Sequence, residues 1–417
     1  MQTNLFSFSS IIFQLYDIRT FIFVSKLQNL QKTISIIQIN SISALGNTSH
    51  SVWENYHLEL PLFQKRKFSN KSYWIAPVSE SIEKNIEELK EENSSYQYLD
   101  RSVLLAILAS REALKGNAIN PEVLGVNLGS SRGATQLFES HHQEFLATGK
   151  VKTRTSPTTT LGNIASWVAQ DLQTQGPVLS HSITCATALH ALINGVAWLR
   201  SGMADTFLVG GSEAPLTDFT LAQMEALKLY SKKEEECPCE SMKMDKKSNS
   251  MVLGEAASVC ILEVGISDKT KAIISGIGYA TEPLSHSISI TPDADCFQKS
   301  MKMALKDAVL DNVDVIVMHA PGTIKGDLAE LNAIHKIFES ETPFLTTNKW
   351  KIGHTFGASG AMSLEMAVLI LQHQEVIYNP FYRNNTTPNT INHIMINAVG
   401  FGGNAVSIII SKPGLYL

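Results

Sequence analysis

An α/β protein made of two related halves is the fold that the sequence predicts. Short runs of β-branched and other apolar residues alternate with stretches whose apolar residues recur at helical spacing. The same alternation starts a second time near Lys271. The chain has 417 residues, 44% of them hydrophobic and 18% charged, so it is long and apolar enough to bury two fused halves.

The first half shows three strand-like runs and two helical stretches. The strands are expected at Ile34–Ile39, Val123–Leu128 and Thr206–Val209, and the helices at Ser102–Leu114 and Ala186–Leu199. Because these strands are almost wholly apolar, we expect them to be buried on both faces.

The second half repeats this order of elements. A strand at Ala272–Ile277 leads to a helix at Cys296–Leu310, a strand at Val313–Met318 and a closing strand at Val406–Ile410. We therefore expect an N-terminal half over residues 34–268 and a C-terminal half over 269–417, related by internal duplication although no residue-level repeat is visible.

Two segments differ from this pattern. Residues 1–33 have apolar patches interrupted by Asp17 and Arg19, so they contain no run of about 18 apolar residues as a membrane span needs. We expect a disordered extension there, with a peripheral anchor as the alternative. The charged stretch Ser231–Lys247 is expected to be an exposed loop.

Charge and cysteine content exclude several classes of function. The formal net charge of −5 gives no basic face for nucleic acid. Five cysteines at irregular spacing fit reduced thiols in a cytoplasmic protein better than a disulfide framework. The pair Cys237 and Cys239 falls short of the four ligands of a zinc site, so neither a metal nor a cofactor is expected.

Cys185 is the candidate nucleophile. The segment Ser180–Ala188 runs from a small-residue strand into a helix that is expected to start at the cysteine. There the positive end of the helix dipole would favour the thiolate and lower the thiol pKa. Taken alone, Cys185 could equally be a small buried hydrophobic residue.

Three later segments carry further candidate site residues. His319 ends an apolar strand and enters a turn, Lys349 precedes His354 by five residues, and Gly400–Asn404 forms a tight glycine loop around Phe401. Each has an ordinary explanation by itself, as a core histidine, a surface lysine or a turn. Their combination with Cys185 favours one catalytic site.

In this order the four segments resemble the signature of the β-ketoacyl synthases, condensing enzymes of the thiolase superfamily. The resemblance covers about residues 34–412 and includes Ser43–Trp53 as an opening turn and Gly210–Glu213 as the turn after a strand. It implies a thiolase-like fold, two related α/β halves layered α-β-α-β-α. It also implies decarboxylative Claisen condensation of an acyl group with malonyl-acyl carrier protein, in fatty acid, polyene or polyketide synthesis.

The resemblance assigns roles by position. Cys185 would carry the acyl group, while His319 and His354 would bind the malonyl thioester and promote loss of carbon dioxide. The backbone N–H groups of Cys185 and Phe401 would form an oxyanion hole, with Phe401 as a gate. The supporting residues would be Lys349 as a charge partner, Asp327 and Glu330 as its acidic partners, Thr323 for the pantetheine arm, and Gly400 and Gly402 for the backbone of the gate.

Departures from the family pattern limit the resemblance. Ala320 and Pro321 follow His319 where the family has glycine and threonine, so only Thr323 remains to bind the pantetheine arm. Ser248–Ser250 replaces an arginine-aspartate-glycine segment, and Val399 replaces a phenylalanine. In these details the chain resembles the ketosynthases of bacterial pigment and aryl polyene clusters.

The expected partners are acyl carrier protein and a second subunit, either a copy of this chain or a homologue. A non-catalytic chain-length-factor-like subunit is the alternative function, although such a subunit normally lacks the nucleophile. A degradative thiolase is a further alternative, but it would need a second cysteine near Gly400–Asn404, where the sequence has none.

Other residues that attract notice are given ordinary explanations. His141, His142, His181 and His190 match no family motif and are expected to be structural or solvated. The basic run Lys65–Lys67 is expected to be a solvated loop, with docking of an acidic carrier protein as its alternative.

Overall fold

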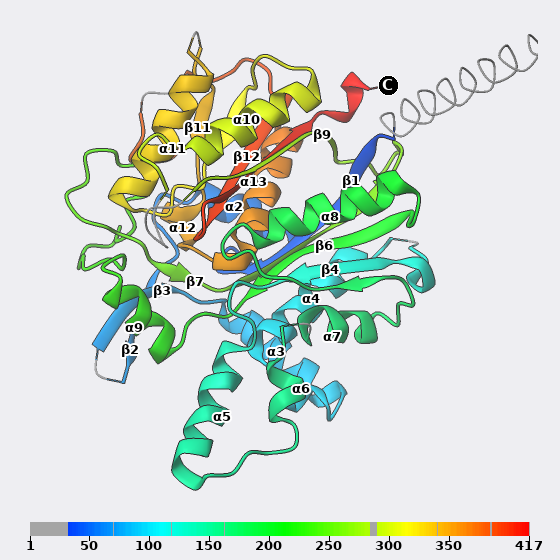
Figure 1. The fold of residues 1–417 in the computed structure, drawn as a ribbon, viewed down its shortest axis with the longest axis vertical. Helices are drawn as coiled ribbons and strands as arrows, with labels where there is room; N and C mark the ends of the chain where they lie inside the picture. Colours follow the sequence, from blue (N-terminus) through cyan, green and yellow to red (C-terminus); the bar gives the residue numbers. More distant parts are fainter. Residues whose placement is uncertain are drawn as a thin grey trace, which may run out of the picture.

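The structure of the chain is a computed structural model (Figure 1). It describes residues 32–69, 71–117, 119–161, 163–283, 290–339, 341–383 and 386–416. The predicted N-terminal extension covers residues 1–33, and its first 31 residues lie outside the described part of the chain.

The N-terminal half contains eight strands and eight α-helices among its described residues. They are β1 (Ile34–Ser43), α2 (Ser49–His57), β2 (Gln64–Phe68), β3 (Lys71–Ala76), α3 (Glu80–Glu92), α4 (Arg101–Leu114), β4 (Gly125–Gly129), α5 (Thr135–Thr148), α6 (Thr155–Thr159), α7 (Asn163–Asp171), β5 (Val178–Leu179), α8 (Thr187–Ser201), β6 (Thr206–Glu213), α9 (Asp218–Ala226), β7 (Leu253–Gly254) and β8 (Ala256–Val264).

The C-terminal half follows with five strands, four α-helices and two short 3-10 turns in its described part, and the second turn, η4 (Pro413–Leu415), comes after the last strand. The other elements are β9 (Ala272–Thr281), α10 (Asp295–Ala308), β10 (Val315–Val317), α11 (Ile324–Ile337), β11 (Phe344–Thr346), α12 (Lys349–Ile352), η3 (Phe356–Ala358), α13 (Ser359–His373), β12 (His393–Gly400) and β13 (Asn404–Ser411).

Ten strands form one mixed sheet in which each half contributes five. From the centre outwards the order is β1-β8-β6-β4-β5 on one side and β9-β13-β12-β10-β11 on the other. Both series have two antiparallel pairings followed by two parallel ones. The two halves meet where β1 pairs with β9, with Ile34 opposite Ile274. The two halves therefore have the same order of strands and the same directions of pairing, as the internal duplication inferred from the sequence would produce.

Helices cover the sheet in layers, as expected for the predicted fold class (Figure 1). Helices α4 and α7 pack on the outer face of the N-terminal strands, and α10 and α11 on the outer face of the C-terminal strands. Helices α8 and α13 lie between the halves and contact each other. Thirteen consecutive residues of α13, from Ser359 to Leu371, are buried. A helix that is apolar on all sides belongs in such a central layer.

Several element bounds differ from the sequence prediction. The expected strand Val123–Leu128 begins only at Gly125, because Pro121 starts a 3-10 turn that continues to Val123. Gly210–Glu213, expected as a turn, continues strand β6, where Gly210 pairs with Val259. A Cβ at Gly210 would lie 2.1 Å from the Ser258 carbonyl oxygen, so the glycine permits close strand pairing.

The prediction of an exposed loop at Ser231–Lys247 was wrong for its second part. Cys239, Glu240, Ser241 and Met242 are buried, and so is Lys246. The Lys246 ammonium lies 2.9 Å from the Asp327 carboxylate, and both side chains are almost fully enclosed. The sequence does not show this partner, which lies 81 positions away.

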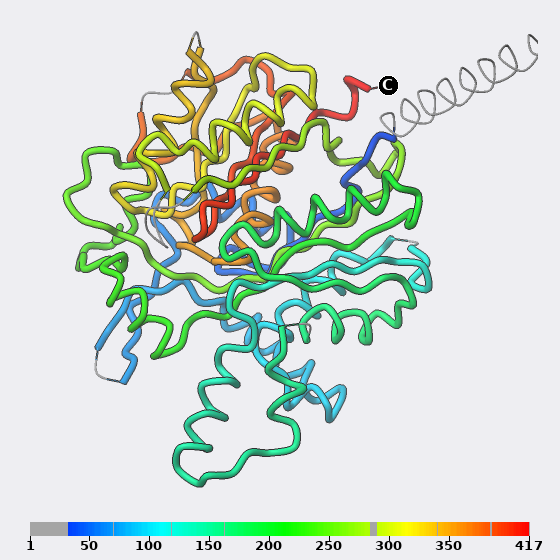
Figure 2. The backbone as a smooth tube through the Cα atoms, viewed as in Figure 1, coloured from blue at the N-terminus to red at the C-terminus, as the bar shows by residue number. Residues whose placement is uncertain are grey.

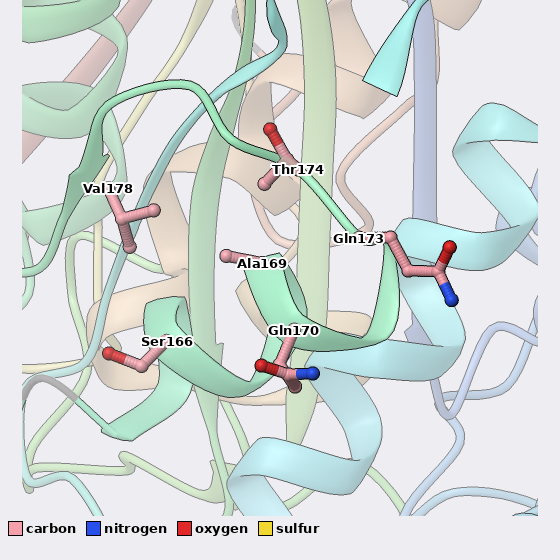
Figure 3. A pocket seen from close by; sticks show the side chains of 6 residues that line it. All are labelled: Ser166, Ala169, Gln170, Gln173, Thr174 and Val178. Atoms are coloured by element: carbon pink, nitrogen blue, oxygen red, sulfur yellow. The ribbon is translucent and has the colours of Figure 1, made fainter. Parts of the chain in front are cut away.

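Two surface features concern the N-terminal half. Helices α5 and α6 extend out of the body of the molecule (Figure 2), and α5 exposes three large apolar side chains, Phe138, Phe145 and Leu146. A cavity of about 450 Å³ lies beside edge strand β5, and its lining includes Ser166 and Gln170 of α7 and Val178 of β5 (Figure 3). No helix in the described part of the chain is long and apolar enough to span a membrane.

Candidate active site

Cys185 lies in a tight turn between β5 and α8. The helix begins at Thr187, so the cysteine precedes it by two residues instead of starting it. Thr184, just before the cysteine, has a φ of 45°, a left-handed conformation that non-glycine residues rarely adopt. The Cys185 side chain is 95% enclosed, and it packs in an apolar cluster with Leu221 and Phe356.

The environment of the thiol opposes ionisation. Burial, followed by the nearby Glu213 carboxylate, raises the pKa of Cys185 to about 12, although the charges of Lys349 and Arg132 act in the opposite direction. The prediction that the helix terminus lowers this pKa was therefore wrong, because enclosure in apolar surroundings outweighs the partial charge of a helix end. A base must remove the proton when the thiol reacts.

His354 is placed to be that base. Its Nε2 lies 3.0 Å from Cys185 Sγ, and its Nδ1 lies 3.3 Å from the Ser359 hydroxyl at the start of α13. Backbone hydrogen bonds on both sides hold the residue, since its N–H donates to the Val252 carbonyl at 2.7 Å and its carbonyl accepts from Gly254 at 3.2 Å. Burial lowers the pKa of His354 to about 3, so the imidazole is neutral and able to accept a proton.

His319 follows β10 and meets His354 edge to face. The two ring centroids are 5.2 Å apart and the rings are perpendicular. The backbone N–H groups of His319 and Ala320 both donate to the Glu330 carboxylate at 2.9 Å, which fixes the turn at the strand end. Burial, followed by electrostatic interaction with the His354 ring and with Lys349, lowers the pKa of His319 well below its ordinary value.

Asp327 organises the next part of the same turn. One oxygen accepts from the backbone N–H groups of Gly322 and Thr323 at 3.0 and 3.1 Å. The other accepts from the Met242 N–H and from the Lys246 ammonium. The residue thus pairs with Lys246 and not with Lys349, which the resemblance had named as its partner.

Lys349 begins α12 behind the two histidines and is 99% enclosed. Its Nζ donates to Asn348 Oδ1 at 2.8 Å and to the Ser363 hydroxyl at 3.3 Å. No carboxylate oxygen among the described residues lies within 4.0 Å of it, so Glu330 acts on it only at longer range. Burial lowers the pKa of Lys349 to about 8.

The hairpin between β12 and β13 brings Phe401 close to the turn that carries Cys185. A Cβ at Gly400 would lie 1.9 Å from the Thr184 hydroxyl oxygen, so only glycine lets the two backbones come this close. The same hydroxyl donates to the Phe401 carbonyl at 3.3 Å. Gly402 has a φ of 101°, which closes the turn.

These groups surround a mainly apolar cavity of about 580 Å³. Cys185, His319, His354 and Phe401 lie along it together. The remaining polar lining includes Asn249, Thr323, Lys325 and Glu330. The cavity thus offers a thiol, a neutral base and a second neutral histidine to a ligand with an apolar part.

Two family models match the chain. The N-terminal domain of β-ketoacyl synthase matches residues 35–265, and the C-terminal domain matches residues 271–381. The chain belongs to the β-ketoacyl synthase family.

Curated relatives agree with this family over nearly their whole length. A 3-oxoacyl-[acyl-carrier-protein] synthase 2 of Staphylococcus aureus (strain COL) is 25% identical, over 91% of this chain and 98% of the relative. Nodulation protein E of Rhizobium leguminosarum bv. trifolii is 27% identical, over 90% and 98%.

Solved structures show the same fold. A ketosynthase in complex with its chain length factor from Xenorhabdus doucetiae is 21% identical with a TM-score of 0.77, over 91% of this chain and 98% of that one. A β-ketoacyl synthase from Burkholderia phymatum STM815 has the same identity and TM-score, over 92% and 100%.

The sequence prediction missed what Glu213 does in this ketosynthase. Its buried carboxylate accepts from the Ser130 hydroxyl at 2.9 Å, the Ser131 N–H at 2.7 Å and the Gly357 N–H at 2.9 Å. It thereby joins the loop after β4 to the turn that follows His354. Burial raises the pKa of Glu213 to about 7. A charged residue at the end of an apolar strand was the only signal in the sequence.

Other predicted candidates lie apart from the ketosynthase site. Lys65–Lys67 lie in the exposed strand β2, which pairs with β3, so the prediction of a loop there was wrong. Lys65 pairs with Glu234. His181 contacts Asn127 and the Thr187 carbonyl, which is a structural arrangement. All five cysteines are free thiols. No group of three or more histidine, cysteine, aspartate or glutamate residues in the described ranges could hold a metal.

Proposed function

We propose that this protein joins an acyl group on Cys185 to a malonyl unit by decarboxylative Claisen condensation, with both substrates delivered by acyl carrier protein. The observation that carries the proposal is the 3.0 Å contact between His354 Nε2 and Cys185 Sγ, with His319 beside it in the same cavity. Family membership supports the same reaction.

In the first half-reaction Cys185 is acylated. The thiol proton passes to His354 Nε2 as the sulfur attacks the thioester carbonyl. The N–H groups of Cys185 and Phe401 are proposed to stabilise the resulting oxyanion. The carrier thiolate then leaves and takes the proton back from His354, so the base is neutral again for the second substrate.

In the second half-reaction the malonyl thioester occupies the side of the site that holds both histidines. Loss of carbon dioxide leaves an enolate whose oxygen accepts hydrogen bonds from two neutral imidazoles, His319 and His354. The acylated sulfur no longer offers a proton to His354 Nε2, so in this step the ring proton of His354 is on Nε2. The enolate carbon attacks the acyl-Cys185 carbonyl, the carbon–sulfur bond breaks, and the released cysteine thiolate takes up a proton from solvent water to restore the thiol.

Lys349, Asp327 and Glu330 are proposed to be positioning residues. Glu330 holds the backbone at His319 and Ala320, and Asp327 holds it at Gly322 and Thr323. The Lys349 charge lies close enough to His319 and His354 to disfavour their protonation. Gly400 and Gly402 shape the hairpin that carries Phe401, and Thr323, at the cavity, is proposed to contact the pantetheine arm.

The proposed assembly is a dimer, with this chain or a homologous subunit as partner, in the cytoplasm. Five unpaired cysteines support a reducing compartment. The structure of the ketosynthase from X. doucetiae contains its chain length factor, and another ketosynthase structure contains its acyl-carrier protein, with 21% identity to this chain in both cases. A place in polyene or polyketide synthesis is proposed alongside fatty acid synthesis.

A non-catalytic chain-length-factor role is the second candidate, because similar structures include a ketosynthase/chain length factor pair. The Cys185–His354 contact disfavours it, since a silent subunit has no need of a thiol and a base in hydrogen-bonding distance. A thiolase is disfavoured because the Gly400–Asn404 hairpin has no cysteine.

Mass spectrometry tests the proposal directly. After incubation with an acyl carrier substrate, or with the mechanism-based inhibitor cerulenin, we expect the adduct on Cys185. The Cys185→Ala variant should not condense, and Cys260→Ala, which removes a buried cysteine of β8, should remain active. Labelling at another residue, together with full activity of Cys185→Ala, would refute the assignment.

A further inference from the structure

Arg132 places a positive charge next to the nucleophile. It lies in the loop between β4 and α5, and its backbone N–H donates to the buried Glu213 carboxylate at 3.1 Å. Its guanidinium carbon lies 5.8 Å from the centroid of the Phe356 ring, which lines the cavity. Its charge is close enough to Cys185 to favour the thiolate. Because the Arg132 backbone is held by Glu213, the side chain can place its guanidinium only within a limited region near Phe356 and Cys185.

No carboxylate among the described residues forms an ion pair with the guanidinium, although Glu139 interacts with it electrostatically at longer range. One of its terminal nitrogens donates to the neutral Gln223 amide oxygen of α9. No carboxylate in the described part of the chain lies within 4.0 Å of it, and its buried Nε has no hydrogen-bond partner. A buried donor left unsatisfied destabilises the protein, so an N–H in this position is suited to an acceptor that arrives with a ligand.

The positions of the residues around Cys185 indicate which part of a bound substrate would lie near Arg132. His319 and His354 must be free for the malonyl group while the acyl group remains on the sulfur, so the acyl tail has to extend away from His319. Cys185 belongs to an apolar cluster that includes Phe356 and, on α9, Leu221 and Met224. Gln223, which holds Arg132, belongs to the same helix.

We propose that Arg132 is a specificity-determining residue that selects acyl groups carrying an oxygen acceptor, a ketone or a carboxylate, beyond the thioester. The inference rests on the proposed condensing function and deepens it by naming the acyl class. An oxygen near the guanidinium would satisfy the unpaired Nε–H through a charge-assisted hydrogen bond. A saturated chain in the same position would leave that donor buried without an acceptor, so it is disfavoured.

Three pantetheine thioesters of six-carbon acyl groups test this idea, because carrier recognition does not enter the comparison. Hexanoyl, 5-oxohexanoyl and adipoyl thioesters would be offered to the wild-type protein, and the rate of Cys185 acylation followed by mass spectrometry. We expect at least one oxygenated donor to react faster than hexanoyl. In Arg132→Met that ratio should fall about tenfold or more, as expected for loss of a hydrogen bond to a charged group.

Arg154→Met is the matched control, because Arg154 also lies over an aromatic ring, Tyr98, but is exposed and outside the site. Its ratio should equal that of the wild type. Arg132→Lys keeps the charge without the planar fork and should give an intermediate ratio, which preserves the test if Arg132→Met folds poorly by thermal melting. The same preference in wild type and Arg132→Met, or faster reaction of hexanoyl in both, overturns the proposal while leaving the condensing function intact. No adduct on Cys185 from any donor refutes both.

Discussion

At the scale of single residues, the proposed chemistry depends on two neutral groups in contact. The Cys185 thiol has a pKa raised to about 12 and the His354 imidazole a pKa lowered to about 3, both chiefly through burial. Neither group changes its charge between pH 5 and 9. Transfer of a proton from sulfur to nitrogen therefore leaves the net charge of the pair unchanged, whatever the pH of the solution.

We therefore expect alkylation of Cys185 by iodoacetamide to be nearly independent of pH from about 5 to 9. In His354→Ala the thiol loses its base, so the remaining rate should rise about tenfold per pH unit. Site-resolved mass spectrometry at several pH values measures both rates. A steep pH dependence in the wild type would show that His354 does not accept the thiol proton.

The two histidines should differ in what they do for each half-reaction. His319→Ala removes a donor to the enolate but leaves the Cys185–His354 contact, so carbon dioxide release from malonyl carrier protein should fall about a hundredfold while acylation continues. His354→Ala should slow both steps. His142→Ala, on the exposed face of α5, is the control. Unchanged carbon dioxide release in both active-site variants would contradict the decarboxylative reaction.

At the scale of elements, the site is assembled where turns from distant parts of the chain come together. The β12–β13 hairpin approaches the Cys185 turn at Gly400, and the loop at Cys239–Lys246 supports the turn after β10 through Asp327. Each contact requires a specific small or charged residue, so each can be tested by substitution.

Gly400→Ala should displace the hairpin because the new methyl group would lie 1.9 Å from Thr184 Oγ1 and 2.8 Å from the Ile183 carbonyl oxygen. We expect a loss of about 1–3 kcal/mol in the free energy of unfolding, together with slower acylation as Phe401 moves. Gly414→Ala is the control, since nothing lies within 4 Å of a Cβ there. Urea unfolding and acylation rates that are equal in the two variants would contradict this account.

Breaking the Lys246–Asp327 pair should be costly. Lys246→Met leaves the Asp327 carboxylate buried without its cation, and we expect about 3–5 kcal/mol lower free energy of unfolding. Lys336→Met breaks the half-exposed pair with Asp293 and should cost about 1 kcal/mol or less. Denaturant unfolding of both variants makes the comparison. Equal small losses would mean that Asp327 is held by its backbone donors alone.

At the scale of the whole molecule, the N-terminal half has a surface suited to a second subunit. Edge strand β5 has only two residues, and a cavity lies beside it (Figure 3). Helix α5 exposes Phe138, Phe145 and Leu146. An exposed strand edge with nearby apolar side chains is typical of a protein interface.

Light scattering should therefore give about twice the chain mass of 45.8 kDa, or a complex with a homologous subunit. Leu146→Glu on α5 should weaken the dimer. Val309→Glu, at a residue 88% exposed in the C-terminal half, should leave it intact. A stable monomer with full condensing activity would contradict the proposed assembly.

The sequence by itself determined the fold class and the family, and it predicted the residues of the candidate site. Periodicity identified the main strands and helices, because buried strands and amphipathic helices impose apolar patterns on adjacent residues. The family signature named Cys185, His319, Lys349 and His354 before any geometry was known, since the spacing within each motif is local.

Only the tertiary structure decided which residues become partners and how the site is charged. It paired Asp327 with Lys246, placed Glu213 behind His354 through Gly357, and brought Arg132 to Phe356 without an ion-paired carboxylate among the described residues. It also reversed the expected shift in the pKa of Cys185. These properties depend on burial and on contacts between segments far apart in the chain, and neither has a signal in the order of neighbouring residues.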